Sequence, residues 1–310
     1  MDISGIFNID KPAGWTSFRV VSLVRRLSGV RRVGHAGTLD PAATGVLVVC
    51  LGQATRLVEY MMEATKVYRA EVRLGITTDT LDATGTPVGQ ADPSNISRQQ
   101  VEEALTAFVG EIDQVPPMFS ALKYNGEPLY RYARAQIQVE RQARRVTIHR
   151  LQLLAFQPPL ATIEVECGKG TYIRALAHDL GQQLGCGAHL AALARLRVGP
   201  FTLEDACSLA GLEAAFREGH WQSLLHPADA ALPSCPAVTL SEPQERAVRF
   251  GQCLPADSLE PAPAQAVGNG QLCRAYSSRG QLVAILRYDA AAFLWRPAKV
   301  FAAAERAQKA

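Results

Sequence analysis

The sequence lacks the features that mark membrane, secreted and metal-binding proteins. It has no run of about 18 consecutive apolar residues, so no transmembrane helix is predicted. Residues 1–5 contain no basic segment leading into an apolar core, so we expect no secretory signal. The seven cysteines include no Cys-x-x-Cys pair, which argues against a zinc site. Their odd number favours reduced thiols and a cytoplasmic protein.

The composition is that of an ordinary globular protein, but its charge is unevenly spread. The 310 residues suffice for one large domain and a small one, and the net charge of +3 does not by itself indicate a nucleic-acid partner. Residues 121–150, however, hold seven Lys or Arg against two Glu, with three tyrosines among them. Such a segment suits a phosphate backbone and unstacked bases. On charge alone, a solvated surface segment is an equal alternative.

The most informative stretch is residues 34–47, which holds Asp40 within a loop of special backbone geometry. Gly34 and Gly37 permit positive φ or close approach, and Pro41 biases Asp40 towards an extended conformation. A carboxylate held in this way is ionised at neutral pH and can act without a base to activate it. The spacing alone favours a plain turn over a catalytic loop.

Periodicity and capping signals predict the elements around this loop. Apolar spacing through Phe18, Val21 and Val24 predicts a helix that begins at Thr16 or Ser17 and ends at Gly29. Residues 66–74 alternate, which predicts a strand with Tyr68 on its buried face. Further expected elements are strands at 5–12, 46–51 and 161–167, a helix capped by Ser97 and Gln100, and a helix over about 172–184.

Two polar segments have some features of ligand sites but fit other interpretations better. Residues 168–171 precede a helix but lack the spacing of a P-loop. Asp79 and Asp82 fit Asx-turns better than a calcium loop. Arg174 falls in the first turn of its helix, on the same face as His178, where a cation is poorly placed relative to the helix dipole. That position indicates a carboxylate or phosphate partner for Arg174.

A change of pattern divides the chain near its end. Residues 228–238 have the composition of a linker or domain edge, and beyond them short strands alternate with Gly and Pro turns. The strands expected at 273–276, 282–286 and 293–295 predict a small β-rich domain.

Several separated segments together resemble one family, the tRNA pseudouridine synthase B (TruB) family. They occur in the family's order and are residues 7–17, 34–47, 66–69, 114–123, 168–174 and 189–201. The resemblance implies an α+β fold with a central mixed, mainly antiparallel sheet. It implies a catalytic domain over 1–235 with an RNA-binding insertion at about 120–148, and a PUA-like RNA-binding domain over 238–306.

The resemblance also implies an activity. The substrate would be the T-stem loop of tRNA, where the uridine at tRNA position 55 becomes pseudouridine. The N1–C1′ bond breaks, the uracil rotates and C5 is joined to C1′, without cofactor or metal. No membrane and no protein partner are implied, and a monomer is expected.

The family's motifs assign expected roles to individual residues. Asp40 would start glycosidic cleavage, as nucleophile or as base, and Arg174 would keep it ionised and aimed. Tyr68 would stack on the flipped uracil and assist removal of the C5 proton, and Leu193 would form an apolar wall.

Three further positions are expected to serve the substrate. Tyr172 and Lys66 would line the site. His35 would fill the space that the flipped base leaves, although a histidine bonded to nearby backbone is the plainer interpretation without the family.

Two rival functions share these features. A carboxylate-dependent glycosylase or nucleoside hydrolase would also need an aspartate and a flipped base, but it would release free base. A non-catalytic tRNA-binding or tRNA-folding protein would use only the basic segment and the C-terminal domain.

Overall fold

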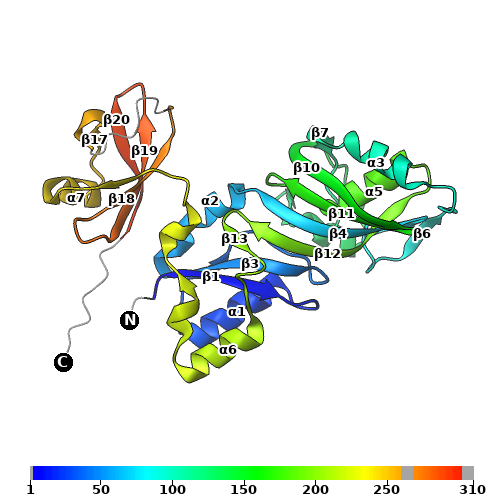
Figure 1. The fold of residues 1–310 in the computed structure, drawn as a ribbon, viewed down its shortest axis with the longest axis horizontal. Helices are drawn as coiled ribbons and strands as arrows, with labels where there is room; N and C mark the ends of the chain where they lie inside the picture. Colours follow the sequence, from blue (N-terminus) through cyan, green and yellow to red (C-terminus); the bar gives the residue numbers. More distant parts are fainter. Residues whose placement is uncertain (1–2, 260–267, 302–310) are drawn as a thin grey trace.

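A mixed sheet of eleven strands organises most of the molecule (Figure 1). The computed structural model describes residues 3–259 and 268–301. The main path of the sheet runs β14 (Cys207–Ser208), β1 (Gly5–Lys11), β3 (Thr44–Leu51), β12 (Ala188–Val198), β4 (Lys66–Leu74), β11 (Leu160–Cys167), β10 (Arg144–Gln157) and β7 (Gly110–Gln114). Three short strands join it from the side: β2 (Val33–His35), β13 (Phe201–Thr202) and β15 (Leu225–His226).

The sheet is mainly antiparallel, as predicted. The parallel pairs in it are β1 with β14 and β3 with β12. The second of these is short, since it joins only Ala194 to Thr44 and Arg195 to Gly45. This short junction unites the half of the sheet built around β1 and β3 with the half built around β4, β11 and β10. The loop that carries Asp40 leads directly into it.

Each half of the sheet is covered by its own helices (Figure 1). The β1 side packs on α1 (Ser17–Ser28) and α6 (Leu209–Glu218), and the β4 side packs on α3 (Arg98–Thr106) and α5 (Ile173–Gln183). The caps are those predicted: Thr16 accepts from Arg19 N, Ser97 and Gln100 form a capping box, and Gly29 ends α1 at φ 69°.

One prediction about α1 is wrong. Phe18 does not face the core but is 69% exposed. The buried stripe of α1 runs instead through Val20, Val21, Leu23 and Val24. Two overlapping stripes of helical spacing exist in this segment, and the sheet selects the one without the phenylalanine.

The remaining elements connect this framework. They are η1 (Gly52–Leu57), α2 (Val58–Glu63), the hairpin of β5 (Ile76–Thr78) with β6 (Pro87–Gln90), the hairpin of β8 (Lys123–Tyr124) with β9 (Glu127–Pro128), α4 (Leu129–Arg134), η2 (Trp221–Leu224) and η3 (Ala228–Ala231).

A second sheet of five strands forms the C-terminal unit. Its order is β16 (Ala237–Thr239), β18 (Leu272–Tyr276), β19 (Leu282–Asp289), β20 (Leu294–Val300) and β17 (Leu254–Pro255), accompanied by α7 (Glu242–Arg249) and η4 (Ala256–Ser258). Trp295 lies in its core, 1% exposed. The three predicted strands are confirmed. The predicted extension to residue 306 lies partly outside the described residues.

The segment between the two units is partly buried. Ala231 and Leu232 are buried in one cluster with Ile6 of the large sheet and Ile285 of the small one. An ion pair between Lys299 Nζ and Glu59 Oε1, 2.7 Å apart, adds to this contact. The predicted linker therefore lies at a domain edge and helps to join the two units.

Within the described residues, no helix is long and apolar enough to cross a membrane. No group of three or more His, Cys, Asp or Glu is placed to hold a metal ion in that part of the chain.

Candidate active site

Asp40 lies in the loop between β2 and β3. The backbone of that loop is held by hydrogen bonds to the residues at and just before the start of α1. Ser17 Oγ accepts from Leu39 N at 2.9 Å and donates to Leu39 O at 3.1 Å. On the other side of Asp40, Pro41 O accepts from Gly14 N at 2.8 Å. The aspartate therefore stands between two anchored residues, which restricts where its carboxylate can point.

A buried lysine reinforces the same loop. Lys11 is 0% exposed, and its Nζ donates to Pro12 O, Trp15 O and Pro41 O at 3.0, 2.8 and 3.3 Å. Burial lowers the pKa of Lys11 to about 8, against the opposing charge of Asp40. The sequence offered no reason to single out this lysine, because its carbonyl partners come from separate turns.

The glycines of the loop differ in their roles. Gly37 has φ +108°, as its position suggested, whereas Gly34 has no positive φ and open space around it. The critical glycine is Gly45, at φ +96°, where a Cβ would lie 2.2 Å from Arg195 O. Only glycine permits β3 and β12 to approach so closely at their junction.

Arg174 provides the cation that faces Asp40. Its Nε lies 2.9 Å from Asp40 Oδ2, and the arginine side chain is 6% exposed whereas that of the aspartate is 41% exposed. The guanidinium also donates to Phe119 O at 2.8 Å and Thr80 O at 3.4 Å. The predicted partner of Arg174 is thus a carboxylate. The other residue predicted on its face, His178, has a buried Nδ1 without a hydrogen-bond partner among the described residues.

A second carboxylate, Asp82, lies near the same nitrogen of the Arg174 guanidinium. Its Oδ2 is 3.8 Å from Arg174 Nε. Its Oδ1 accepts from Thr84 N at 3.0 Å, which confirms the predicted Asx-turn. Burial raises the pKa of Asp40, the Arg174 guanidinium lowers it, and the like charge of Asp82 raises it. Sequence reasoning explained Asp82 as a turn residue and missed its place beside Arg174.

The start of α5 is fixed by a side-chain amide. Gln114 Oε1 accepts from Tyr172 N at 2.8 Å, and Gln114 Nε2 donates to Tyr172 O at 3.1 Å. This pair of bonds positions the helix that carries Arg174. Burial raises the pKa of the Tyr172 phenol, which also lies within the fields of Arg174 and Asp40.

Tyr68 and Leu193 approach the site from the two strands at the centre of the sheet. Tyr68 on β4 is half-buried, and burial raises the pKa of its phenol. Leu193 on β12 is paired with Ala70 of β4, and its carbonyl accepts from Thr44 Oγ1 at 3.5 Å. Both predicted residues therefore border the strand junction that the Asp40 loop enters.

His35 and Lys66 lie in the surrounding shell. His35, on β2, is partly buried, and its Nδ1 has no hydrogen-bond partner in the described part of the chain. Burial and the charge of Arg195 lower its pKa, which keeps it neutral at pH 7. Lys66 Nζ donates to Met62 O, and burial lowers the pKa of Lys66 to about 8. Neither residue forms an ion pair with Asp40 within the described ranges.

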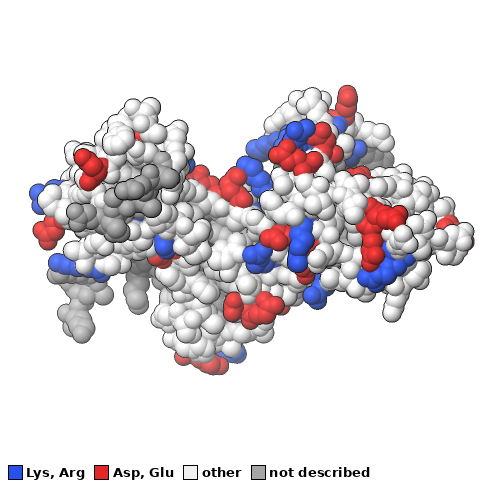
Figure 2. Space-filling model, turned by 45° about the horizontal axis from the view of Figure 1, so that its top comes forward, with Lys and Arg blue, Asp and Glu red and all other residues white. Residues whose placement is uncertain are grey.

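The basic segment around 121–150 is less uniformly positive than its sequence suggests. Arg131, Arg145 and Arg150 have acidic partners, and Arg141 donates to Pro116 O at 3.0 Å. On the molecular surface, Lys and Arg form separate patches with Asp and Glu between them (Figure 2).

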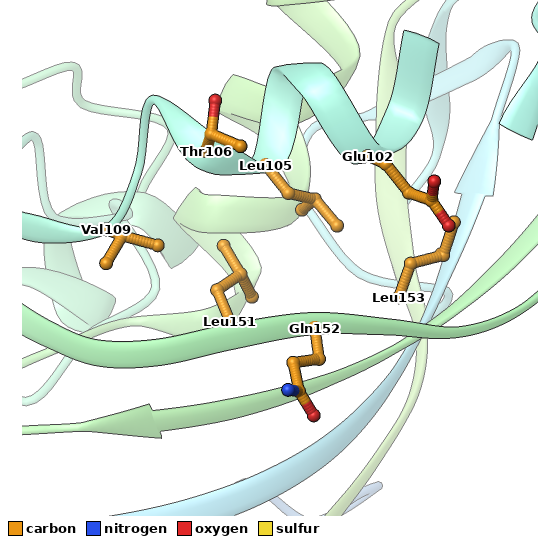
Figure 3. A pocket seen from close by; sticks show the side chains of 7 residues that line it. All are labelled: Glu102, Leu105, Thr106, Val109, Leu151, Gln152 and Leu153. Atoms are coloured by element: carbon orange, nitrogen blue, oxygen red, sulfur yellow. The ribbon is translucent and has the colours of Figure 1, made fainter. Parts of the chain in front are cut away.

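An apolar hollow elsewhere does not belong to this site. It lies between α3 and β10 and is lined by Leu105, Val109, Leu151, Leu153 and three polar neighbours (Figure 3). None of the residues around Asp40 contributes to it. The chemistry-bearing residues converge instead on the open carboxylate of Asp40, which can attack an electron-poor carbon as a nucleophile or take a proton as a base.

Comparison with family models agrees with this geometry. Residues 25–173 match the model described as TruB family pseudouridylate synthase (N terminal domain). Residues 174–233 match the model described as tRNA pseudouridylate synthase B C-terminal domain. The two matched regions meet at the pair of residues 173 and 174, within the start of α5.

Curated relatives are similar over most of their length. A tRNA pseudouridine synthase B of Syntrophotalea carbinolica is 53% identical over 74% of this chain and 74% of its own. The protein of that name in Ralstonia nicotianae is 46% identical over 92% of this chain and 89% of its own. The one in Dehalococcoides mccartyi is 42% identical over 96% and 97%.

Solved structures show the same architecture. A chain in a Cbf5-Nop10-Gar1 complex superposes with a TM-score of 0.72 at 28% identity, covering 92% of this chain and 78% of that one. A chain in an H/ACA RNP bound to a substrate RNA containing 2′-deoxyuridine superposes with a TM-score of 0.73 at 25% identity, covering 96% and 85%.

Proposed function

The chain belongs to the TruB family of pseudouridylate synthases, and from that premise we propose that it modifies the T-loop uridine at tRNA position 55, with Asp40 as its catalytic carboxylate. Its reaction is the isomerisation of uridine to pseudouridine in tRNA. The observation that carries the proposed site is the Asp40–Arg174 pair, in which a buried cation holds a partly exposed carboxylate at 2.9 Å.

The reaction exchanges one bond of the base for another. The N1–C1′ bond breaks, C5 bonds to C1′, the C5 proton leaves and N1 takes up a proton, so no atom is gained or lost. A base inside a stacked loop is out of reach of Asp40, so the uridine is flipped into the site. Asp40 then begins cleavage, either by attack at C1′ or by taking a proton.

The residues around Asp40 have complementary parts in this proposal. Arg174 keeps the carboxylate ionised against the effect of burial and of Asp82. Tyr68 stacks on the flipped uracil and receives the C5 proton, and Leu193 provides an apolar wall on the opposite strand.

Three outer residues serve recognition. Tyr172 and Lys66 line the approach to the site. His35 enters the space that the flipped base leaves, and its place at the end of β2, where the Asp40 loop begins, supports this role.

The basic insertion is the proposed contact to the T stem. Arg134 lies over the Tyr130 ring, 5.6 Å from its centroid, and Arg144 lies within the field that acts on Tyr172. Neither arginine has an acidic partner among the described residues. Both are therefore available to phosphates beside the site. The C-terminal five-stranded unit, as a PUA-like module, provides a second RNA contact.

We propose that the enzyme acts as a monomer where tRNA is found, in the cytoplasm. We test the proposal with purified protein, a chelator and an unmodified tRNA transcript. Carbodiimide adducts mapped by primer extension reveal pseudouridine, which leaves the RNA mass unchanged.

The expected result is a single new stop at the T-loop uridine, absent with Asp40→Asn and absent from a transcript with cytidine at that position. An abasic site or free uracil would instead support the glycosylase. Tight binding without modification would support the RNA-binding alternative. A stop at another uridine would overturn the proposed position.

A further inference from the structure

Arg195 is a buried arginine at the centre of the site. It lies within the segment 189–201, but the family's motifs gave it no expected role. It is 1% exposed. Its Nε donates to Val46 O at 2.7 Å and its Nη2 donates to Gly37 O at 3.1 Å. The ion pairs found within the described ranges do not include it. Burying a charge without an acidic partner is costly, so its position calls for a function.

The two carbonyls that Arg195 binds belong to the two ends of the catalytic loop. Gly37 precedes Asp40, and Val46 follows it at the start of β3. Both bonds come from one rigid guanidinium on the neighbouring strand β12. They therefore fix the distance between the two ends of the loop. The absent Cβ of Gly45 lets the Arg195 backbone come within this reach.

The same arginine faces Tyr68. Arg195 of β12 and Tyr68 of β4 are directly opposed in the antiparallel pair, so their side chains share one face of the sheet. A hydrogen bond and the charge of Arg195 lower the pKa of the Tyr68 phenol, against burial, which raises it more strongly. One guanidinium thus connects the phenol to the loop that carries Asp40.

We propose that Arg195 is a positioning residue, which holds the Tyr68 phenol in place relative to Asp40 so that the phenol oxygen can take the C5 proton while its own proton passes to water. This inference rests on the proposed role of Tyr68. In that step the C5–H bond breaks and its electron pair forms the C5–C6 double bond. The π pair of the N1=C6 double bond returns to N1, which takes a proton from the water that received the phenol proton. Arg195 makes and breaks no covalent bond.

The test compares Arg195→Gln with a matched variant, Arg197→Gln, from the same strand. Arg197 is half-exposed and pairs with Glu166 at 2.7 Å. Single-turnover rates at saturating enzyme are measured with tRNA carrying protium or deuterium at C5 of the target uridine, together with tRNA affinity.

We expect Arg195→Gln to lower the rate about 10²-fold, as for a misplacement of about 1 Å in a reacting group. Its affinity for tRNA should stay near that of the wild type. Its isotope effect should exceed that of the wild type, because proton removal becomes slower relative to the other steps. Arg197→Gln should stay within about twofold, as for an exposed ion pair.

A cycle with Tyr68→Phe separates this role from general stabilisation. If Arg195 acts through Tyr68, the double variant is no slower than Tyr68→Phe alone. The proposal would be overturned if the rate losses of the two single variants multiply in the double variant. An unchanged isotope effect in Arg195→Gln would also overturn it. If Arg195→Gln does not fold, Arg195→Lys replaces it. Its single-turnover rate should fall at least about tenfold, because an ammonium lacks the guanidinium fork. A wild-type rate in Arg195→Lys would equally overturn the proposal.

The failures of the two proposals are distinguishable. A wild-type protein that forms no pseudouridine at the T loop contradicts the proposed function. A wild-type protein that does so, with Tyr68→Phe fully active, contradicts the role of Tyr68 and with it that of Arg195.

Discussion

Arg174 and Asp40 form an ion pair in which one partner is buried and the other remains accessible. Their Nε and Oδ2 atoms are 2.9 Å apart, and the exposed fractions of the two side chains are 6% and 41%. The Arg174 guanidinium is held in place by backbone carbonyls and is shielded from solvent. The Asp40 carboxylate is accessible to a substrate. This asymmetry suits a reacting group that must stay ionised without being enclosed.

Replacement of the arginine should raise the pKa of Asp40. Arg174 lowers this pKa against burial and Asp82, so its loss in Arg174→Lys leaves a weaker opposing interaction. The carboxylate would then be protonated at higher pH, and the acid limb of the single-turnover rate should move to higher pH. At neutral pH we expect the single-turnover rate of Arg174→Lys to be about 10²-fold lower, because the Asp40 carboxylate is no longer correctly oriented. An acid limb identical to that of the wild type would contradict this assignment.

Removal of the second carboxylate should act in the opposite direction. Asp82→Asn keeps an oxygen for Thr84 N but removes the like charge that raises the pKa of Asp40. The acid limb should therefore move to lower pH. The same assay measures both variants, and a shift of equal sign in the two would show that Asp82 does not act through Asp40.

A buried thiol should make the protein less stable in alkali. Cys50 is 0% exposed, and burial raises its pKa from an ordinary value of about 9 to about 12. Between these values the unfolded chain loses a proton from Cys50 that the folded chain keeps, so the contribution of Cys50 to stability falls as pH rises above about 9, by up to about 1.4 kcal/mol per pH unit. The free energy of unfolding, measured with urea from pH 8 to 10, should fall less steeply with pH in Cys50→Ala than in the wild type. The control Cys253→Ala, at a partly exposed site, should keep the wild-type slope.

The close approach at the strand junction predicts an unequal cost for two glycine substitutions. In Gly45→Ala the new Cβ would meet Arg195 O at 2.2 Å, whereas at Gly29, also at positive φ, nothing lies within 4 Å. Gly29→Ala should cost about 1 kcal/mol from backbone strain alone. Gly45→Ala should cost about 3 kcal/mol or more, since backbone must move. Equal unfolding free energies would contradict the rigid junction.

The unpaired basic residues of the insertion should govern the salt dependence of tRNA binding. Lys123→Ala/Arg144→Ala removes two cations without acidic partners in the described residues. We expect weaker binding and a shallower dependence of log K on log salt, by about one unit per lost phosphate contact. Arg98→Ala, which breaks an ion pair with Glu102 on α3, serves as the control and should leave the slope unchanged.

Local signals were sufficient for much of the fold. The caps Thr16 and Ser97, the C-terminal Gly29 and the alternation of residues 66–74 act within a few residues, so the sequence alone shows where α1, α3 and β4 lie. The exposed Phe18 was missed because a helix with two possible apolar stripes is resolved only by what it packs against.

The site divides in the same way. The loop of Asp40 and the need of Arg174 for an anionic partner are visible in the chain, since both depend on neighbouring residues. Their pairing, and the additional presence of Asp82, depend on how α5 and the turn after β5 meet beside the loop. Lys11 and Arg195 could not be found from spacing, because each buried cation donates to at least one carbonyl that is 30 or more residues away in the sequence.

The sequence by itself thus determined many of the elements, the candidate catalytic carboxylate Asp40 and the resemblance to the family, because backbone propensity, capping and a contiguous loop are local properties. Only the tertiary structure decided which charges surround Asp40. Electrostatic interactions act through space, and the short β3–β12 junction brings distant charged residues within a few ångströms of one another.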